Sequence, residues 1–377
     1  MNVLLLEALS TPELLLDLDA MERNAQRMRD HVRTLGLDFR PHVKTAKCIE
    51  VVERMLGEGP RRIAVSTLRE AEWFLTRGVS DILYAVGVVP ARFERLSRLV
   101  RAGADLTLVV DSAAVVVALA AFASAENLVF RVLVELDVGA GRAGVSPDSA
   151  ELLEIATLIA ACPSLRLSGV MTHAGHAYGA ADLEDRRRIA RAEAAMAAHA
   201  ADRLRLSGLP VDIVSIGSTP SIDALDERLG ATEARTGVYI FNDLDQLKLG
   251  VCQRSDLALT VLSRVVGHNR AAGRLLIDAG ILALSKDRGL TPSGVPSYGE
   301  ICDPKTLLPI EGLTLSNLNQ EHGIAEVADE GVYERLPVGA LVRVVPNHAC
   351  ITAAAFQGYA LVRGDQVVDR WARDNGW

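Results

Sequence analysis

Lys44 carries the first chemical signal in this chain, because it closes a short apolar stretch, residues 37–43, that has the pattern of a strand. A lysine at the carboxyl end of a strand offers its amine to a concave site. An amine whose charge is poorly solvated loses basicity, becomes nucleophilic and can form a Schiff base with a carbonyl. A solvated surface lysine that merely closes the strand explains the same position. The rest of the sequence has to decide between these two interpretations.

A second signal is the tetrapeptide Gly217-Ser218-Thr219-Pro220. Glycine permits close backbone approach, the two hydroxyls can donate, and a helix N-terminus that follows adds a favourable dipole for a phosphate. Taken alone, these residues describe only a turn. Barrels of eight strands often bind phosphate after strands seven and eight, and this segment follows the seventh predicted strand. A phosphate site together with a strand-end lysine predicts pyridoxal 5′-phosphate (PLP), whose aldehyde needs the amine.

A third signal is the segment Pro346-Asn347-His348-Ala349-Cys350. If this segment is extended, residues two apart point to the same face, so His348 and Cys350 can bind one metal ion together. Imidazole and thiolate are ligands that Zn²⁺ prefers, and two ligands leave positions open for water or substrate. A buried thiol beside an unrelated histidine is the alternative interpretation.

Three further features have two interpretations each. Arg142 lies in a glycine-rich loop, where it can orient a carboxylate or the cofactor, or simply be solvated. His322 is either catalytic or part of a turn. Glu135 and Asp137, at a strand end, form an acid/base pair or bind the amides of the loop that follows.

Eight strand-like segments alternate with amphipathic helical segments, and this alternation has to position the residues above. The predicted strands are residues 37–43, 62–66, 81–86, 105–110, 129–137, 166–172, 211–217 and 233–240. Several are nearly continuous apolar runs, as expected of parallel strands covered on both faces. Eight successive βα units favour a closed barrel over an open doubly wound sheet. We therefore predict an α/β fold with a PLP-binding (β/α)8 barrel over residues 19–250.

The pattern changes after about residue 250, where segments of period two are separated by glycine and proline. We predict a second, β-rich domain from residues 1–18 and 251–377, with the N-terminal segment returning to pair with it. Residues 286–300 are rich in glycine and proline and predict a long loop that could act as a lid.

Composition narrows the class of protein. The chain has 377 residues, 49% of them hydrophobic and 23% charged, which is typical of a globular protein that buries a large core. A net charge of −8 argues against a nucleic-acid or anionic-membrane partner. Five scattered cysteines suit a reducing cytoplasm rather than a disulfide framework, and no apolar stretch reaches the length of a membrane span.

Together the motifs resemble the fold type III PLP enzymes, specifically the D-serine dehydratase and D-threonine aldolase family with its alanine-racemase-like barrel. The resemblance runs over essentially the whole chain. It rests on residues 40–45 (Arg-Pro-His-Val-Lys-Thr), 66–72, 172–175 (Thr-His-Ala-Gly), 217–220, 319–323 (Asn-Gln-Glu-His-Gly) and 346–350 (Pro-Asn-His-Ala-Cys).

The resemblance implies that Lys44 binds PLP and acts as the catalytic base, and that His348 and Cys350 bind a divalent metal near the substrate hydroxyl. It implies Zn²⁺, with Mn²⁺ or another divalent ion as the alternative. It places substrate contacts at Gln320 and His322, and it implies a homodimer in the cytoplasm that acts on a small D-amino acid. The implied cofactor-binding residues are Lys44, Arg142, His173, Tyr178, Gly217, Ser218, Thr219, Gly237, Val238 and Tyr239.

Within this family the metal motif separates two reactions. Aldolases tend to carry His-x-Asp with Asp-Glu-His-Gly, and dehydratases tend to carry His-x-Cys with Gln-Glu-His-Gly, which is the combination of this chain. The resemblance therefore implies elimination of the β-hydroxyl from a D-3-hydroxy amino acid, such as D-threo-3-hydroxyaspartate or D-serine, to a keto acid and ammonia. Residues 138–144 look closer to the aldolase loop, and His176 is a second departure, so retro-aldol cleavage to glycine and an aldehyde remains the alternative. A racemase that uses Tyr298 or Tyr333, or a PLP-binding protein without activity, fits the sequence less well.

Overall fold

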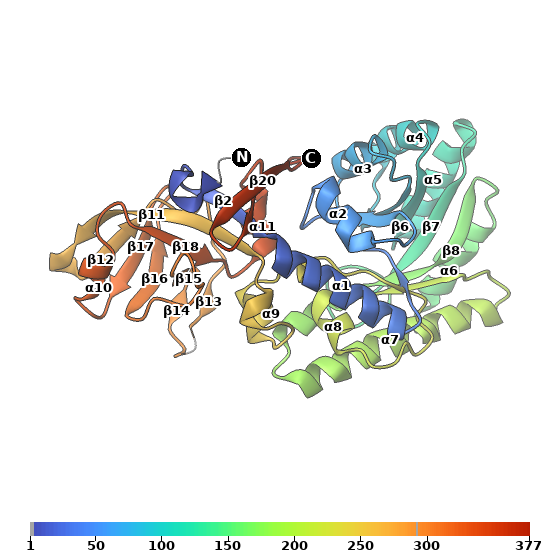
Figure 1. Ribbon diagram of the computed structural model, residues 1–377. Helices are drawn as coiled ribbons and strands as arrows, with labels where there is room; N and C mark the ends of the chain where they lie inside the picture. Colours follow the sequence, from blue (N-terminus) through green and yellow to red (C-terminus); the bar gives the residue numbers. More distant parts are fainter. Residues whose placement is uncertain (1–3, 292) are drawn as a thin grey trace. The chain divides into compact units, whose positions relative to one another are not determined.

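The computed structural model describes residues 4–291 and 293–377, which divide into two compact units (Figure 1). The barrel unit comprises Gln26–Gly237 with the last two residues, and the β unit comprises the segment up to Ala25 together with Val238–Asn375. The domain boundaries predicted above, residues 19–250 for the barrel, stay a prediction. In the described part of the chain, no helix is both long and apolar enough to cross a membrane.

The barrel unit contains eight parallel strands in the order β3-β10-β9-β8-β7-β6-β5-β4. A bridge between His42 and Ala64 joins the first and last strands of this order, with the Val43 amide donating to the Ala64 carbonyl at 2.9 Å. The fold class is therefore confirmed. The elements are β3 (Asp38–Phe39), α2 (Ile49–Leu56), β4 (Arg62–Val65), α3 (Leu68–Leu75), β5 (Asp81–Gly87), α4 (Phe93–Arg101), β6 (Asp105–Val110), α5 (Ala113–Ala125), β7 (Phe130–Leu136), α6 (Ala150–Ala160), β8 (Leu165–Thr172), α7 (Leu183–Leu206), β9 (Ile213–Ile216), α8 (Thr219–Ala224) and β10 (Glu233–Ala234).

The predicted strands match these elements within two residues at each end, except the first and the last. The strand predicted at 37–43 is regular only over β3, because Pro41 has no amide hydrogen and can offer the ladder only its carbonyl, which accepts from Ala64. The strand predicted at 233–240 ends at Ala234, and the chain then forms a 3-10 turn, Val238–Ile240. Gly237 brings the backbone so close to His42 that a Cβ there would lie 2.8 Å from the His42 carbonyl oxygen.

Successive strands contribute side chains to one interior layer of the barrel. Five buried residues from five neighbouring strands pack together: Ala64, Leu83, Val109, Leu133 and Met171. At the amino-terminal end, buried Arg40 pairs with Glu233 and with Asp81, each at 2.7 Å. These ion pairs stabilise the amino-terminal end of the barrel. The active site is then expected at the carboxyl ends of the strands, as is usual in such barrels.

The β unit is built on antiparallel pairing and confirms the β-rich character expected of the C-terminal region. Its strands are β1 (Leu4–Leu5), β2 (Glu13–Asp17), β11 (Leu259–Asn269), β12 (Arg274–Ile277), β13 (Gly289–Leu290), β14 (Pro296–Ser297), β15 (Glu300–Cys302), β16 (Leu313–Leu318), β17 (Gly323–Val327), β18 (Leu341–Val345), β19 (Gly358–Arg363) and β20 (Gln366–Ala372). Its helices are α9 (Leu244–Lys248), α10 (Val332–Arg335) and α11 (Ala349–Ala354), and α1 (Leu18–Thr34) follows β2.

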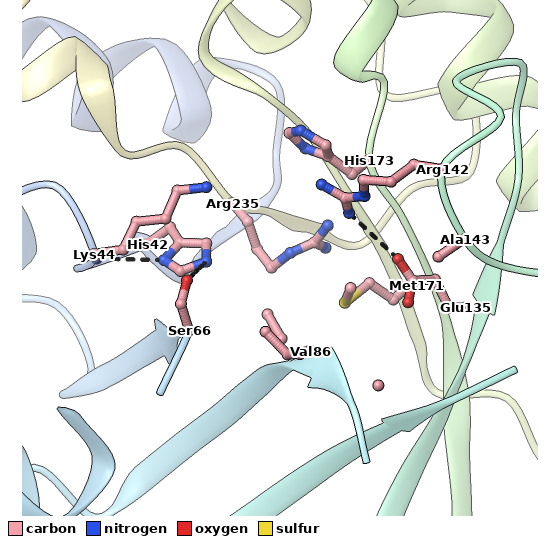
Figure 2. Close-up of a pocket in the computed structure, with 12 residues that line it drawn as sticks. His42, Lys44, Ser66, Val86, Glu135, Arg142, Ala143, Met171, His173 and Arg235 are labelled. Carbon is pink, nitrogen blue, oxygen red and sulfur yellow. Dashed lines mark hydrogen bonds and ion pairs between the residues drawn. The ribbon is translucent and has the colours of Figure 1, made fainter. Parts of the chain in front are cut away.

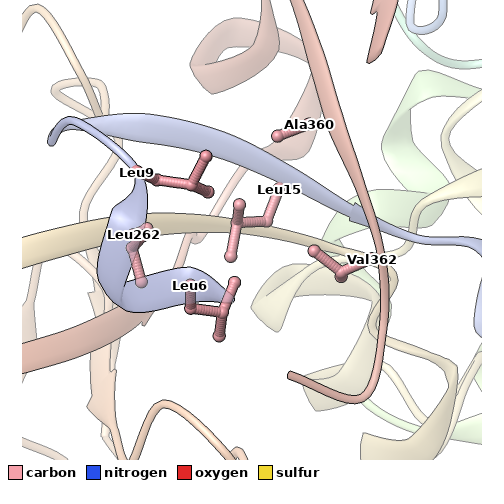
Figure 3. Packing of buried hydrophobic residues seen from close by; sticks show 6 residues of the cluster. All are labelled: Leu6, Leu9, Leu15, Leu262, Ala360 and Val362. Atoms are coloured by element: carbon pink, nitrogen blue, oxygen red, sulfur yellow. The ribbon is translucent and has the colours of Figure 1, made fainter. Parts of the chain in front are cut away.

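The N-terminal segment pairs with this unit, as the sequence predicts. β2 lies between β11, to which it is antiparallel, and β19, to which it is parallel. Apolar residues from distant parts of the chain share one core, in which Leu6, Leu9 and Leu15 pack against Leu262 and Val362 (Figure 3).

Candidate active site

A cavity of about 280 Å³ opens at the carboxyl ends of the barrel strands (Figure 2). We call it the barrel pocket. Its walls come from the segments that follow or end six of the eight strands, which is where barrels of this kind place their chemistry. The lining residues are His42, Lys44, Ser66, Ala85, Val86, Gly87, Glu135, Arg142, Ala143, Met171, His173 and Arg235.

Lys44 is presented to this pocket by a short loop between β3 and α2. Its side chain is exposed, whereas its neighbours Val43 and Thr45 are fully buried and anchor the loop. The loop ends at Lys47, a non-glycine residue with φ of +45°, whose ammonium pairs with buried Glu70 at 3.1 Å. The loop backbone is thus fixed on both sides of Lys44, which places the lysine at the barrel pocket.

His42 lies two residues before Lys44 and was not predicted as a site residue. Its Nδ1 lies 3.4 Å from the Lys44 amide and its Nε2 lies 3.4 Å from the Ser66 hydroxyl (Figure 2). Burial lowers the pKa of His42 well below its ordinary value, and the positive charges of Lys44 and Arg235 act in the same direction. The ring is therefore neutral near pH 7 and does not compete with Lys44 for an anionic group.

His173 lies at the end of β8, where the sequence analysis expects it. Its Nδ1 lies 3.0 Å from the carbonyl oxygen of Gly217, an acceptor, so Nδ1 carries the ring proton and Nε2 is left as an acceptor. Burial lowers the pKa of His173 to about 4. Two neutral imidazoles, His42 and His173, thus line the same pocket.

Arg142 lies in the loop after β7, beside Glu135 of that strand, at 3.4 Å. Burial raises the pKa of Glu135, although Arg142 opposes the shift. The other carboxylate of the pair, Asp137, accepts hydrogen bonds from the amides of Gly139 and Gly141, and these bonds lower its pKa. Asp137 therefore shapes the loop that carries Arg142, whereas Glu135 lines the pocket.

Arg235, which was not predicted, is a buried cation of the pocket. Its guanidinium donates to the Ser215 hydroxyl at 2.7 Å and to the carbonyl oxygen of Thr172. Burial lowers its pKa, yet an arginine stays charged at neutral pH. Figure 2 shows it between the Lys44–His42 side and the Arg142–Glu135 side of the pocket. It provides a fixed positive charge for an anionic or electron-rich ligand.

The segment Gly217-Ser218-Thr219 lies at the start of α8, as predicted for a phosphate cradle. Ser218 is the N-cap of this helix and forms a capping box with Ser221, so its hydroxyl is already engaged. Gly217 has φ of +121°, and a Cβ there would lie 2.8 Å from the Ile222 side chain. A side chain at this position is therefore excluded, because the Ile222 side chain and the Arg235 carbonyl already fill the space a Cβ would need.

The other predicted cofactor residues take different positions. Gly237 follows β10, and Val238 and Tyr239 begin the 3-10 turn behind it, both buried. Tyr178 lies in a 3-10 turn after β8, is 43% exposed, and does not line the barrel pocket. Its role as a cofactor contact stays a prediction.

These features suit PLP. Lys44 supplies an exposed amine, and Arg142 and Arg235 in the same pocket supply positive charge for an anionic group. The buried hydroxyl of Thr236, next to Gly237, has no hydrogen-bond partner in the described part of the chain. Such a group usually binds something that is not protein.

The predicted metal ligands lie in the β unit, where α11 begins. His348 is the N-cap of α11 in an extended conformation, but Cys350 is the second helical residue. The expectation of a fully extended segment is therefore wrong. Because the chain turns at Ala349, the side chains of His348 and Cys350 still lie close enough to form a hydrogen bond. The Nδ1 of His348 also lies 2.8 Å from a carboxylate oxygen of Asp287.

The surroundings of this pair favour positive charge. Burial acts to lower the pKa of His348, but the hydrogen bond to Cys350 and the carboxylates of Asp243 and Asp287 outweigh it and raise the pKa to about 9. Buried Asp243 accepts the Ala349 amide at 2.9 Å, and burial raises its pKa to about 7. A divalent cation can take the place of the proton on such a histidine, and imidazole with thiolate suits zinc.

Few of the described side chains near His348 and Cys350 could bind a metal ion. Over residues 4–291 and 293–377, no cluster of three or more His, Cys, Asp and Glu side chains is placed to hold a metal ion. His348 and Cys350 alone would leave coordination positions open for solvent or a hydroxyl group. Gln320 and His322, predicted to contact substrate, are exposed in the turn between β16 and β17, and this role stays a prediction.

A closed βα barrel with a lysine pocket, joined to a β-rich unit with a His/Cys pair, defines the alanine-racemase-like class of PLP enzymes, fold type III. Family comparison agrees: residues 16–245 match "Alanine racemase, N-terminal domain" and residues 258–362 match "Putative serine dehydratase domain". The chain belongs to the family of D-serine and D-threo-3-hydroxyaspartate dehydratases, which are PLP-dependent lyases.

Three curated relatives show the range of the family. D-threo-3-hydroxyaspartate dehydratase of Delftia sp. (strain HT23) is 41% identical over 98% of both chains. D-serine dehydratase of Schizosaccharomyces pombe is 30% identical over 99% of this chain and 93% of its own length. D-threonine aldolase of Arthrobacter sp. is 31% identical over 97% of this chain and 92% of its own.

Solved structures agree with this assignment. The Delftia D-threo-3-hydroxyaspartate dehydratase superposes with a TM-score of 0.94 at 40% identity, covering 99% of this chain and 100% of that one. A cysteine-to-alanine variant of the same enzyme, described as the metal-free form, also superposes with a TM-score of 0.94 over 99% of this chain and 100% of that one. The fold and family predicted from the sequence are thus confirmed.

Proposed function

We propose that this enzyme is a PLP- and zinc-dependent dehydratase that removes the β-hydroxyl of a D-3-hydroxy amino acid to give a keto acid and ammonia. One observation carries the proposal. Lys44 is exposed in a pocket that also holds two neutral imidazoles and a buried arginine, while a separate His/Cys pair offers ligands for a metal. Loss of a hydroxyl next to an acidic carbon needs both a base and help for the leaving oxygen.

Lys44 is the proposed base in the barrel pocket. PLP, when bound, supplies an aldehyde for the lysine amine and an electron sink for the α-carbon. The Lys44 amine removes the α-proton of the substrate, a role that suits an amine held at a fixed position by its loop. His173 and His42 stay neutral, His173 keeps Nε2 as an acceptor, and Arg235 keeps a positive charge in the pocket. Arg142 can bind a carboxylate through its planar guanidinium.

His348 and Cys350 are the proposed metal ligands. A divalent metal, when bound, acts as a Lewis acid for the leaving hydroxyl, which is a poor leaving group near neutral pH. The thiolate favours zinc over manganese, which prefers carboxylate. The metal-free variant of the Delftia enzyme has a cysteine replaced, and another solved variant of that enzyme has a histidine replaced two positions earlier. This spacing equals that between His348 and Cys350.

The favoured substrate is D-threo-3-hydroxyaspartate, with D-serine next. The relative named for the first substrate covers 98% of this chain at 41% identity, and the relative named for the second is 30% identical. Hydroxyaspartate carries two carboxylates, and the barrel pocket contains two arginines, Arg142 and Arg235. A substrate of higher negative charge suits such a pocket.

Retro-aldol cleavage is the second candidate reaction. The glycine-rich loop at residues 138–144 looks like that of the aldolases, and D-threonine aldolase is 31% identical to this chain. Cleavage needs a base for the hydroxyl proton instead of an acid or metal for the departing oxygen. The two reactions give different products, so they can be separated directly.

One experiment tests both reactions. The protein loaded with PLP and zinc is incubated with D-threo-3-hydroxyaspartate, D-serine and D-threonine, with the L-isomers as controls. From D-threo-3-hydroxyaspartate and D-serine we expect ammonia and a keto acid, one molecule of each per substrate. Chelation of the metal should lower the rate, and added zinc should restore it. Glycine and an aldehyde would select the aldolase instead, and a rate that survives chelation would remove the metal from the proposal.

The assembly is proposed to be a homodimer, by analogy with the fold class, and its net charge of −8 gives no reason to expect a nucleic-acid partner. Light scattering coupled to size exclusion tests this, and a monomer mass at micromolar concentration would contradict it.

A further inference from the structure

We propose that Asp287 positions the metal: its carboxylate fixes the ring of His348 so that Nδ1 carries the proton and Nε2 is left to the metal ion. This inference rests on the proposed function, because it assigns a role around the proposed metal ligands. It adds a residue that no motif in the sequence marks, on a loop predicted only as a lid.

The hydrogen bond between the side chains of Asp287 and His348 sets the orientation of the imidazole ring. Nδ1 of His348 lies 2.8 Å from Oδ2 of Asp287. An ionised carboxylate can only accept, so Nδ1 must donate, and the lone pair of the neutral ring is on Nε2. Histidines that bind metals usually donate their other N–H to a carboxylate or carbonyl, which fixes the tautomer and raises the basicity of the ligand. The hydrogen bond thus holds Nδ1 against Asp287 and turns Nε2 away from it.

The backbone of Asp287 also contacts the segment that carries the proposed metal ligands, residues 347–350. The side-chain amide of Asn347 donates to the carbonyl oxygen of Asp287 at 2.8 Å and to that of Ser297 at 2.9 Å. Gly289 packs so closely that a Cβ there would lie 2.5 Å from the Asn347 side chain. Asp287 therefore cannot move independently of residues 347 and 348, and its carboxylate stays aimed at the histidine ring.

Neighbouring carboxylates have other functions. Asp243 accepts the backbone amides of Ala349 and Gln246, each at 2.9 Å, so it fixes the start of α11 and α9 and not the histidine ring. Asp245 interacts with His348 only through its charge, because no hydrogen bond joins their side chains in the described part of the chain. Asp245 therefore offers a matched control, a nearby carboxylate that adds charge without orienting the ring.

The distinction between ligand and support also follows from the geometry. Asp287 bonds to a ring nitrogen of His348, and the described residues contain no cluster of three side chains that could bind one metal together. Asp287 thus acts through His348. Removing such a support typically weakens metal affinity by about 10- to 100-fold while the ligands remain.

The test measures zinc affinity by competition with a chromophoric chelator for the wild type, Asp287→Ala, Asp287→Asn and the control Asp245→Asn. We expect a loss of about 10- to 100-fold for Asp287→Ala, since the ring is no longer held. Asp287→Asn should lose less, because its amide oxygen can still accept from Nδ1. Asp245→Asn should stay close to the wild type. The melting temperature of the metal-free proteins should be the same, which separates positioning from a role in folding.

A second measurement keeps the inference falsifiable if Asp287→Ala folds poorly. Nitrogen-15 spectra of the histidine rings in the wild-type zinc enzyme should show His348 with a proton on Nδ1 and none on Nε2. A proton on Nε2 overturns the inference, and so does Asp287→Ala with wild-type zinc affinity. A wild type that binds no zinc at all would instead refute the proposed metal site itself.

Discussion

The buried carboxylate of Glu193 accepts the backbone amide of Gly217 at 2.9 Å, and the same oxygen accepts the amide of Ala174 at 3.0 Å. Glu193 comes from α7, whereas its two partners follow β8 and β9. A single side chain therefore joins the two loops that place His173 and the proposed phosphate cradle. A hydrogen bond from His173 Nδ1 to the Gly217 carbonyl strengthens the same connection.

Glu193→Ala should destabilise the protein and loosen this part of the pocket. Two buried amides would lose their acceptor, each at about 1–3 kcal/mol, so the free energy of unfolding should fall by about 2–6 kcal/mol. Urea unfolding measures this change, and a PLP titration should show weaker binding. Glu184→Ala on the same helix is the control, because its side chain is 75% exposed, and it should leave both quantities unchanged. Normal stability in Glu193→Ala would show that water replaces the carboxylate.

Lys44→Ala should remove turnover and the visible absorbance of the lysine-bound cofactor together. The loss of a positioned base alone costs about 10²–10⁴-fold in rate. Absorbance spectra and ammonia release measure the two effects. Lys47→Arg is the matched control on the same loop, since an arginine retains the ion pair with Glu70. Turnover retained by Lys44→Ala would refute the assignment of the base.

The free energy of unfolding should fall as the pH falls through the range in which His173 and His42 take up protons. The pKa of His173 is about 4 in the folded protein and about 6.5 when unfolded, so the unfolded state binds more protons between these values. The stabilisation from the neutral ring is complete above pH 6.5 and is lost toward pH 4, by about 3 kcal/mol. His42 shifts in the same direction.

Urea unfolding between pH 4 and pH 7, without added cofactor, measures this slope. His173→Asn should flatten it, whereas the exposed control His199→Gln should not. An unchanged slope in His173→Asn would mean that other groups control the acid sensitivity.

Gly217→Ala should cost stability and cofactor affinity. The added Cβ would lie 2.8 Å from the Ile222 side chain, at a residue whose φ of +121° disfavours any side chain. Backbone strain of this kind costs about 1–3 kcal/mol. Thermal unfolding and a PLP titration measure both effects. Gly179→Ala in a neighbouring loop is the control, because a Cβ there meets nothing within 4 Å.

Much of the fold follows from local pattern, because parallel strands covered on both faces must be continuously apolar. The run at residues 105–110 is such a case and forms β6 with five buried residues in succession. The ends of the barrel order are less predictable. β3 and β10 have two residues each, because Pro41 limits the regular ladder after β3 and the chain forms a 3-10 turn after β10, and hydrophobicity marks neither limit.

The candidate site was predictable where residue type and strand position coincide. Lys44 and His173 end or follow strands and line the barrel pocket, as does Arg142. His42 could have been found from the period of two that places it on the face of Lys44. Arg235 could not, because its burial depends on Ser215 and Thr172, which lie far from it in sequence.

Supporting carboxylates left no signal in the sequence. Glu193 lies in an ordinary amphipathic helix, and Asp287 lies in a loop rich in glycine and proline. Their partners, Gly217 and His348, are remote along the chain, and only the folded structure brings each pair within 3 Å. Local composition carries no information about such contacts.

The position of β2 has a consequence for biosynthesis. This strand is translated before the barrel residues Gln26–Gly237, yet its partners β11 and β19 follow those residues in the chain. At about 5–20 residues per second, Leu14, Leu15 and Leu16 wait tens of seconds for the strands that bury them. Residues Gln26–Gly237 of the barrel unit are all translated within that interval. Nascent chains of this protein should therefore need protection at β2, and a truncation that removes β19 should aggregate even though residues Gln26–Gly237 are present.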